Sequence, residues 1–161
     1  MNRERIERLL HVLDVAAATA KRRDDESGGD RLDMATWGEE TACGFAGCAV
    51  GWASRDAWFK REGLEVKYSS VLVRGHDTGS QYGDLASFFG ATIDECIYLF
   101  APFTDDDRSR YTTDTPCTVS ARVREVAARY GHVFAALPRC ARYTPSDDAA
   151  LAGALAPDAG R

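Results

Sequence analysis

Residues 32–53 read LDMATWGEETACGFAGCAVGWA and carry the densest structural signal in the chain. The stretch holds two tryptophans, two cysteines and four glycines around an alanine-rich run. Glycine is unfavourable inside a helix because it loses the most backbone freedom on folding and brings no side chain to the packing. Gly47 and Gly51, one helical turn apart, therefore indicate that another part of the chain lies close against this segment.

The spacing of apolar residues predicts a buried helix over residues 45–59, at the centre of the fold. The residues that share its broad apolar face are Phe45, Cys48, Ala49, Trp52, Ala53 and Phe59. Gly63 follows as the signal that ends the segment. We expect the first helix of the chain and residues 32–37 to clasp this central helix.

The rest of the chain predicts four more helices and one hairpin. Amphipathic spacing, caps and helix-ending glycines place the helices at residues 3–22, 82–89, 92–100 and 115–131. Alternating residues at 64–68, followed by 71–73, predict a short antiparallel β-hairpin. The fold class is therefore mainly α (α+β), with about five helices around the central Gly/Ala-rich helix. We expect one globular domain over residues 1–146 and a flexible Ala/Gly/Pro-rich tail over residues 147–161.

Composition limits the class of protein. The chain has 161 residues, 45% of them hydrophobic, which suits one domain with a real core. Its net charge of −5 disfavours a general nucleic-acid binder, which needs a cationic face. No apolar run approaches the roughly 20 residues that span a bilayer, and the charged N-terminus does not resemble a secretory signal. Five scattered cysteines form a poor disulfide framework, so we expect a cytoplasmic protein without a membrane partner.

The motif at residues 32–53 resembles one shared by a group of small uncharacterised proteins of phages and bacteria. Those chains show Met-x-x-Trp, a variable gap, and then Cys-Gly-Thr-x-x-Cys-x-x-Gly-x-Ala. Residues 85–92, Leu99-Phe100 and the helix start Thr115-Pro116 are also similar to that group, so the resemblance covers about residues 5–131. It implies a shared fold and no particular activity. Phe45 stands where the group usually has threonine, which removes a hydroxyl beside Cys43 and weakens a catalytic interpretation.

Cys43 is the candidate nucleophile of this sequence. It precedes the expected helix, whose dipole and free N–H groups would lower the pKa of a thiol. His76 follows the second strand of the hairpin and could act as its base, with Asp77 or another carboxylate orienting the imidazole. The alternative is that Cys43 and Cys48 are small buried hydrophobic residues at a tight contact, and this is the commoner use of cysteine.

A metal site or a disulfide is a weaker interpretation of the same residues. Cysteine and histidine could ligate zinc, and the candidates are Cys43, Cys48, His76, Cys96 and Cys117. Structural zinc sites usually show close pairs such as Cys-x-x-Cys, whereas the nearest pair here is Cys-x4-Cys. A Cys43–Cys48 disulfide disagrees with a reducing compartment. We therefore expect no metal and no cofactor.

Two further patterns carry little functional weight. Residues 82–100 have the outline of a DNA-binding helix-turn-helix, but the second helix is acidic and apolar rather than basic. Residues 105–107 are three consecutive aspartates that lack the spacing of a calcium loop, and they indicate a solvated acidic loop.

The three tryptophans are Trp37, Trp52 and Trp58, and they are most simply core residues. Any one left exposed would mark a binding surface.

The sequence as a whole favours an accessory or interaction protein of phage or mobile-element type, without enzymatic activity. Its partner would be another protein or a second copy of the chain, since a homodimer is open. The competing hypothesis is a cysteine-dependent hydrolase or transferase that uses Cys43 and His76.

Overall fold

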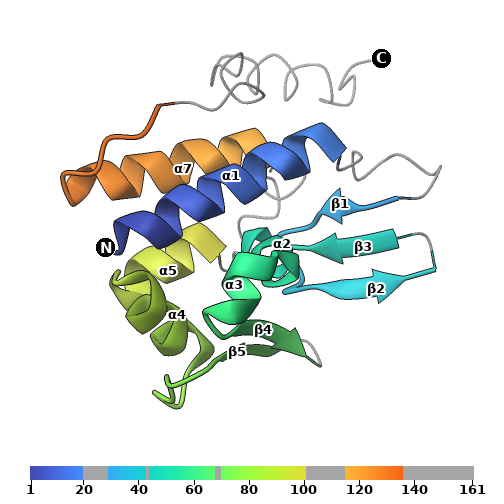
Figure 1. Cartoon of the computed structure of the whole chain (residues 1–161), viewed down its shortest axis with the longest axis horizontal. Coiled ribbons are helices and arrows are strands. Elements are labelled where there is room, and N and C mark those ends of the chain that lie inside the picture. Colours follow the sequence, from blue (N-terminus) through green and yellow to red (C-terminus); the bar gives the residue numbers. More distant parts are fainter. Residues whose placement is uncertain (20–28, 43, 68–69, 101–114, 136–161) are drawn as a thin grey trace, which may run out of the picture.

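The computed structural model describes residues 1–19, 29–42, 44–67, 70–100 and 115–135. Within these ranges the fold is α+β, with more helix than strand (Figure 1). The helices are α1 (Arg3–Thr19), α2 (Ala49–Arg55), α3 (Ala57–Arg61), α4 (Gln81–Phe89), α5 (Ile93–Phe100) and α7 (Pro116–Arg129). The strands are β1 (Arg31–Leu32), β2 (Glu39–Thr41), β3 (Gly44–Gly47), β4 (Leu64–Lys67) and β5 (Ser70–Val73).

The long helices α1 and α7 pack side by side and cover one side of the molecule (Figure 1). The short helix α2 lies centrally and contacts α1, β3 and β4. Helices α4 and α5 pack against each other, and α4 also contacts β5. The apolar faces of these elements meet in one cluster whose fully buried side chains include Leu13, Phe59, Leu85, Phe100 and Val123.

Two small sheets flank α2. The first has the strand order β1-β3-β2, in which β3 runs parallel to β1 and antiparallel to β2. Glu40 lies opposite Phe45 in the antiparallel pair. The second sheet is the antiparallel hairpin of β4 and β5, in which Val66 lies opposite Val71. This hairpin matches the sequence prediction, whereas the first sheet was not predicted.

The predicted helix over residues 45–59 is wrong at its beginning and interrupted near its end. Residues Gly44–Gly47 form strand β3, whose backbone groups are hydrogen-bonded to β1 on one side and to β2 on the other. The Asp30 carboxylate also accepts a hydrogen bond from the N–H of Phe45, at 2.9 Å. Short apolar runs do not distinguish a strand from a helix by periodicity, so the pairing partners decide the conformation here.

Asp56 separates the remaining helical part into α2 and α3. Its backbone is extended, and its carboxylate accepts hydrogen bonds from the N–H groups of Trp58 and Phe59, which makes it the N-cap of α3. The guanidinium of Arg8 donates two more hydrogen bonds to the same carboxylate, at 3.0 and 2.5 Å. Asp56 therefore begins a new helix and ties that helix to α1.

The close approach expected at Gly51 is confirmed. A Cβ atom at this position would overlap the carbonyl oxygen of Trp37 and would lie 3.3 Å from the Cα of Gly38. The segment before β2 thus crosses α2 at backbone contact, as expected for residues 32–37. The helix predicted over residues 3–22 is confirmed over Arg3–Thr19 as α1, and residues 20–22 lie outside the described ranges.

The predicted ends of the later helices are also confirmed. Gly90 and Gly131 follow α4 and α7 with φ of 63° and 73°, a left-handed conformation that favours glycine. Thr92 and Glu95 form the expected capping box before α5, and Thr115 caps α7. The hydroxyl of Tyr130 donates to Glu95 at 2.5 Å, which joins α7 to α5. The expected boundary between residues 146 and 147 lies outside the described residues.

Candidate functional site

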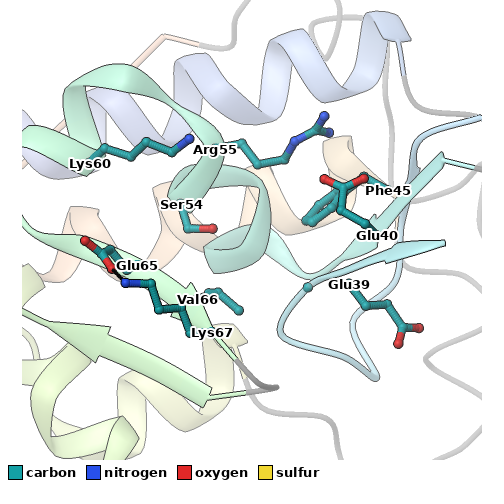
Figure 2. Close-up of a pocket in the computed structure, with 10 residues that line it drawn as sticks. Glu39, Glu40, Phe45, Ser54, Arg55, Lys60, Glu65, Val66 and Lys67 are labelled. Atoms are coloured by element: carbon teal, nitrogen blue, oxygen red, sulfur yellow. Dashed lines mark ion pairs between the residues drawn. The ribbon is translucent and has the colours of Figure 1, made fainter.

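A groove of about 640 Å³ opens between the two small sheets (Figure 2). Strand β2 forms one wall, strand β4 forms the other, and α2 and α3 contribute the residues between them. Its lining residues are Gly38, Glu39, Glu40, Phe45, Ser54, Arg55, Lys60, Glu65, Val66 and Lys67. Both walls are therefore strands at the edge of a sheet, because among the described strands β2 pairs only with β3 and β4 pairs only with β5.

Arg55 and Phe45 fix the inner part of this groove. The Arg55 guanidinium lies 4.5 Å from the centre of the Phe45 ring and pairs with Asp30 at 2.6 Å. The backbone N–H of Phe45 and the Arg55 guanidinium both donate to Asp30, which holds the pKa of that carboxyl below its usual value. The loop before β1 thereby connects β3 to α2, and Arg55 forms this ion pair at the protein surface.

The remaining charges of the groove divide into paired and unpaired groups. On β4, Lys67 and Glu65 form an ion pair at 2.5 Å, and the hydrogen bond from Lys67 lowers the pKa of Glu65. Glu39 and Glu40 on β2 are exposed and make no ion pair with any described residue. Lys60 on α3 is likewise exposed and without an ion pair in the described part of the chain. These three groups can bind a charged partner without breaking an existing pair.

Two of the cysteines are buried thiols. Cys48 stands at the N-cap of α2, where backbone N–H groups favour a thiolate, but its complete burial outweighs them and raises its pKa to about 11. Burial similarly raises the pKa of Cys96 on α5 to about 12. Cys117, on α7, is half-buried. Cys48 and Cys96 are protonated near neutral pH, so neither is a ready nucleophile.

Alkaline pH should destabilise the fold through these two thiols. Their pKa values are raised in the folded state, so the stabilisation is complete below the unfolded-state pKa near 9 and is lost as pH rises toward 11 or 12. We expect about 1 kcal/mol of lost stability per thiol at pH 10. Urea unfolding of the wild type and of Cys48→Ala at pH 8 and pH 10 measures this. The variant should lose less stability between the two pH values, and equal losses would contradict the assignment.

The predicted catalytic group of Cys43, His76 and Asp77 is described only for its histidine and aspartate. Cys43 itself lies outside the described residues, so its pairing with His76 stays a prediction. The helix start expected directly after Cys43 is absent, because strand β3 follows it and α2 begins only at Ala49. The argument for a thiol pKa lowered by a helix dipole therefore does not apply at this position. Asp77 is exposed.

His76 has a partner that the sequence did not predict. Its Nδ1 lies 2.6 Å from the hydroxyl oxygen of Ser87, one residue before Phe88 on α4. A serine and a histidine at this distance can form a nucleophile and base pair, but neither residue lines the groove or the second concave site. His76 and Ser87 are eleven residues apart in the sequence, with a loop between them, and this spacing does not indicate a contact.

The tryptophans do not form an exposed binding surface. Trp52 is buried, and its indole N–H donates to the carbonyl oxygen of Arg31 at 3.2 Å. Trp37 and Trp58 are half-buried and pack against the core. The second concave site, of about 300 Å³, includes Trp52 with His11 from α1, and this histidine is exposed.

The other sites considered from the sequence are a metal centre, a DNA-binding helix pair and an acidic loop. Within the described ranges, no three histidine, cysteine or acidic side chains come together as a metal site would require. In the α4–α5 pair, α5 buries Cys96, Leu99 and Phe100, so these residues do not face a nucleic acid. The acidic residues 105–107 lie outside the described residues. In the described chain, no helix has the length and apolar character needed to cross a bilayer.

Comparisons with known proteins give no family for this chain. No family model, no curated protein and no solved structure matches it. The candidate function therefore depends on the chemistry of the groove. None of its lining residues was predicted as a functional residue from the sequence, and the one available signal was the pair of glutamates, Glu39 and Glu40, within residues 32–53.

Proposed function

We propose that the protein is a non-enzymatic interaction protein that holds a segment of another protein in the groove between β2 and β4. The observation that carries this proposal is the construction of the groove from two sheet edges with unpaired charges. Edge strands present backbone N–H and C=O groups that can pair with another chain. An extended peptide uses such groups for affinity and uses side-chain pockets for specificity.

The composition of the groove also favours a polypeptide over a small metabolite. Small-molecule sites are commonly enclosed and mainly apolar, with a few converging polar groups. This groove carries six charged residues around Phe45 and Val66. A peptide of several residues could contact both walls at once, whereas a small ligand would reach only part of the lining.

The resemblance to phage and bacterial proteins favours an accessory protein of phage or mobile-element type that acts in the cytosol. The cysteine-dependent enzyme remains the second candidate. It rests on Cys43, whose chemistry is testable by alkylation, while the buried state of Cys48 and Cys96 favours the interaction protein.

A peptide library tests groove binding with a matched pair of variants. The probe is a phage-displayed library of random twelve-residue peptides, selected on the wild type, on Lys60→Trp and on Arg61→Trp. Both positions are exposed neighbours on α3, and both changes remove a positive charge and add a large ring, but only Lys60 lines the groove. Circular dichroism verifies that both variants are folded.

We expect the wild type and Arg61→Trp to enrich related peptides, whose synthetic copies bind both proteins with similar Kd. Lys60→Trp should bind those peptides about tenfold more weakly, because the ring fills the groove and the cation is lost. The proposal is wrong if the wild type enriches nothing beyond the uncoated support. It is also wrong if Lys60→Trp binds the selected peptides as tightly as the wild type does.

A further inference from the structure

Strand β2 is an unusual edge. Its three residues, Glu39, Glu40 and Thr41, are all exposed, and within the described ranges β2 has a paired neighbour only on the β3 side. Glutamate is depleted in strands, and protected edges more often carry lysine or proline. Two adjacent glutamates on an open edge can have either of two roles. They can prevent another strand from pairing with the edge, or they can favour a partner strand of opposite charge.

The two glutamates face different surroundings. Glu40 lies opposite Phe45 in the sheet, so their side chains share one face, which is also the face of Arg55 (Figure 2). Glu39 is on the other face, and its carboxylate points away from Arg55 (Figure 2). Arg55 therefore lies on the side of Glu40, whereas Glu39 lies on the opposite side and makes no ion pair within the described part of the chain.

A second copy of the chain is a poor partner for this edge. If β2 of one molecule paired with β2 of another, the glutamates of both strands would come close together across the pair. Like charges at such cross-strand positions are destabilising. The net charge of −5 adds a general repulsion between copies. The edge is therefore suited to a different and basic chain.

We propose that an extended segment of a partner protein adds to β2 as an additional strand and places a lysine or arginine opposite Glu39. This inference rests on the proposed function, because it specifies how the groove holds its ligand and which residue the ligand must carry. Main-chain hydrogen bonds to the open edge of β2 supply affinity that depends little on sequence. The cross-strand pair with Glu39 supplies the register and the charge preference.

A charge reversal tests the pair, using the same random twelve-residue peptide library. Selection on the wild type should enrich lysine or arginine at one fixed position of the peptides. Selection on Glu39→Lys should replace this preference by aspartate or glutamate, and peptides selected on the wild type should bind the variant about tenfold more weakly. Glu7→Lys makes the same change of net charge at an exposed site on α1, and it should leave the preference and the Kd unchanged.

Backbone methylation tests the added strand. In a strand, alternate N–H groups point to opposite sides, so only one set can bond to β2. N-methylation of that set in a selected peptide should abolish binding, and N-methylation of the other set should be tolerated.

The outcomes separate this inference from the proposed function. Some selected peptides could lose binding to Lys60→Trp and yet carry no fixed lysine or arginine, or tolerate N-methylation at every residue. Either result would overturn strand addition at Glu39 and leave groove binding in place. A failure to enrich any peptide on the wild type would overturn both.

Discussion

Gly51→Ala should lose about 3 kcal/mol or more of unfolding free energy, although it adds a single methyl group. The new Cβ would overlap the carbonyl oxygen of Trp37 and lie 2.9 Å from its carbonyl carbon. Both atoms belong to the backbone, so the overlap can be relieved only if the segment before β2 moves away from α2. Gly51→Leu should be more severe still. Urea unfolding, monitored by tryptophan fluorescence, measures the loss.

Gly131→Ala separates this overlap from the ordinary cost of replacing glycine. Gly131 has a φ of 73°, and a Cβ there would meet no atom within 4 Å. The expected loss is therefore about 1–2 kcal/mol, from backbone conformation alone. If Gly51→Ala unfolds at the same urea concentration as the wild type, the close packing of α2 against the Trp37 carbonyl is wrong.

Phe59→Ala should lose about 4 kcal/mol, because it leaves a large cavity at the junction of several elements. The Phe59 ring is fully buried, and its centre lies 5.1 Å from that of Trp58 and 6.2 Å from those of Phe88 and Phe89. The contacts join α3 to α4. Thermal and urea unfolding both measure this change.

Phe134→Ala provides the comparison at a half-buried aromatic residue. Phe134 packs at the margin of the core and lies under the guanidinium of Arg3, at 5.4 Å. Its removal should cost about 1 kcal/mol, because much of the space is refilled by solvent. Equal losses for Phe59→Ala and Phe134→Ala would contradict the full burial of Phe59 between α3 and α4.

The helices with strong local signals could be predicted from the sequence. Thr92 with Glu95, Thr115 with Pro116, and the terminal Gly90 and Gly131 encode helix ends through contacts within a few residues. Helix α1 has an apolar stripe long enough to be unambiguous. The β4–β5 hairpin likewise shows alternation over adjacent segments.

The region around residues 44–56 could not be predicted in this way. Gly44–Gly47 is a strand because β1 and β2 lie on either side of it, and one of these pairings is parallel. Asp56 interrupts the helix because its carboxylate caps α3 and bonds to Arg8, which is 48 residues away. Neither cause is visible within the local pattern, which by itself resembles one continuous helix.

The candidate site was harder to predict than the fold. Cysteine, histidine and tryptophan are the residue types that the sequence offered as functional candidates. Among them, Cys48 and Trp52 are buried, and His76 contacts Ser87. Glu39 and Lys60 are ordinary surface residues in the sequence. They become a site only because the fold places β2, β4 and α3 around one groove.

The central claim is that the segment rich in cysteine and glycine supports a binding groove and performs no thiol chemistry. The most direct test is the rate at which iodoacetamide alkylates each cysteine at pH 7, resolved by mass spectrometry of the folded protein and of the protein in urea. We predict that Cys48 and Cys96 react only in urea and that Cys43 reacts no faster than free cysteine. Rapid alkylation of Cys43 in the folded protein, lost in His76→Ala, would contradict the claim and favour the cysteine-dependent enzyme.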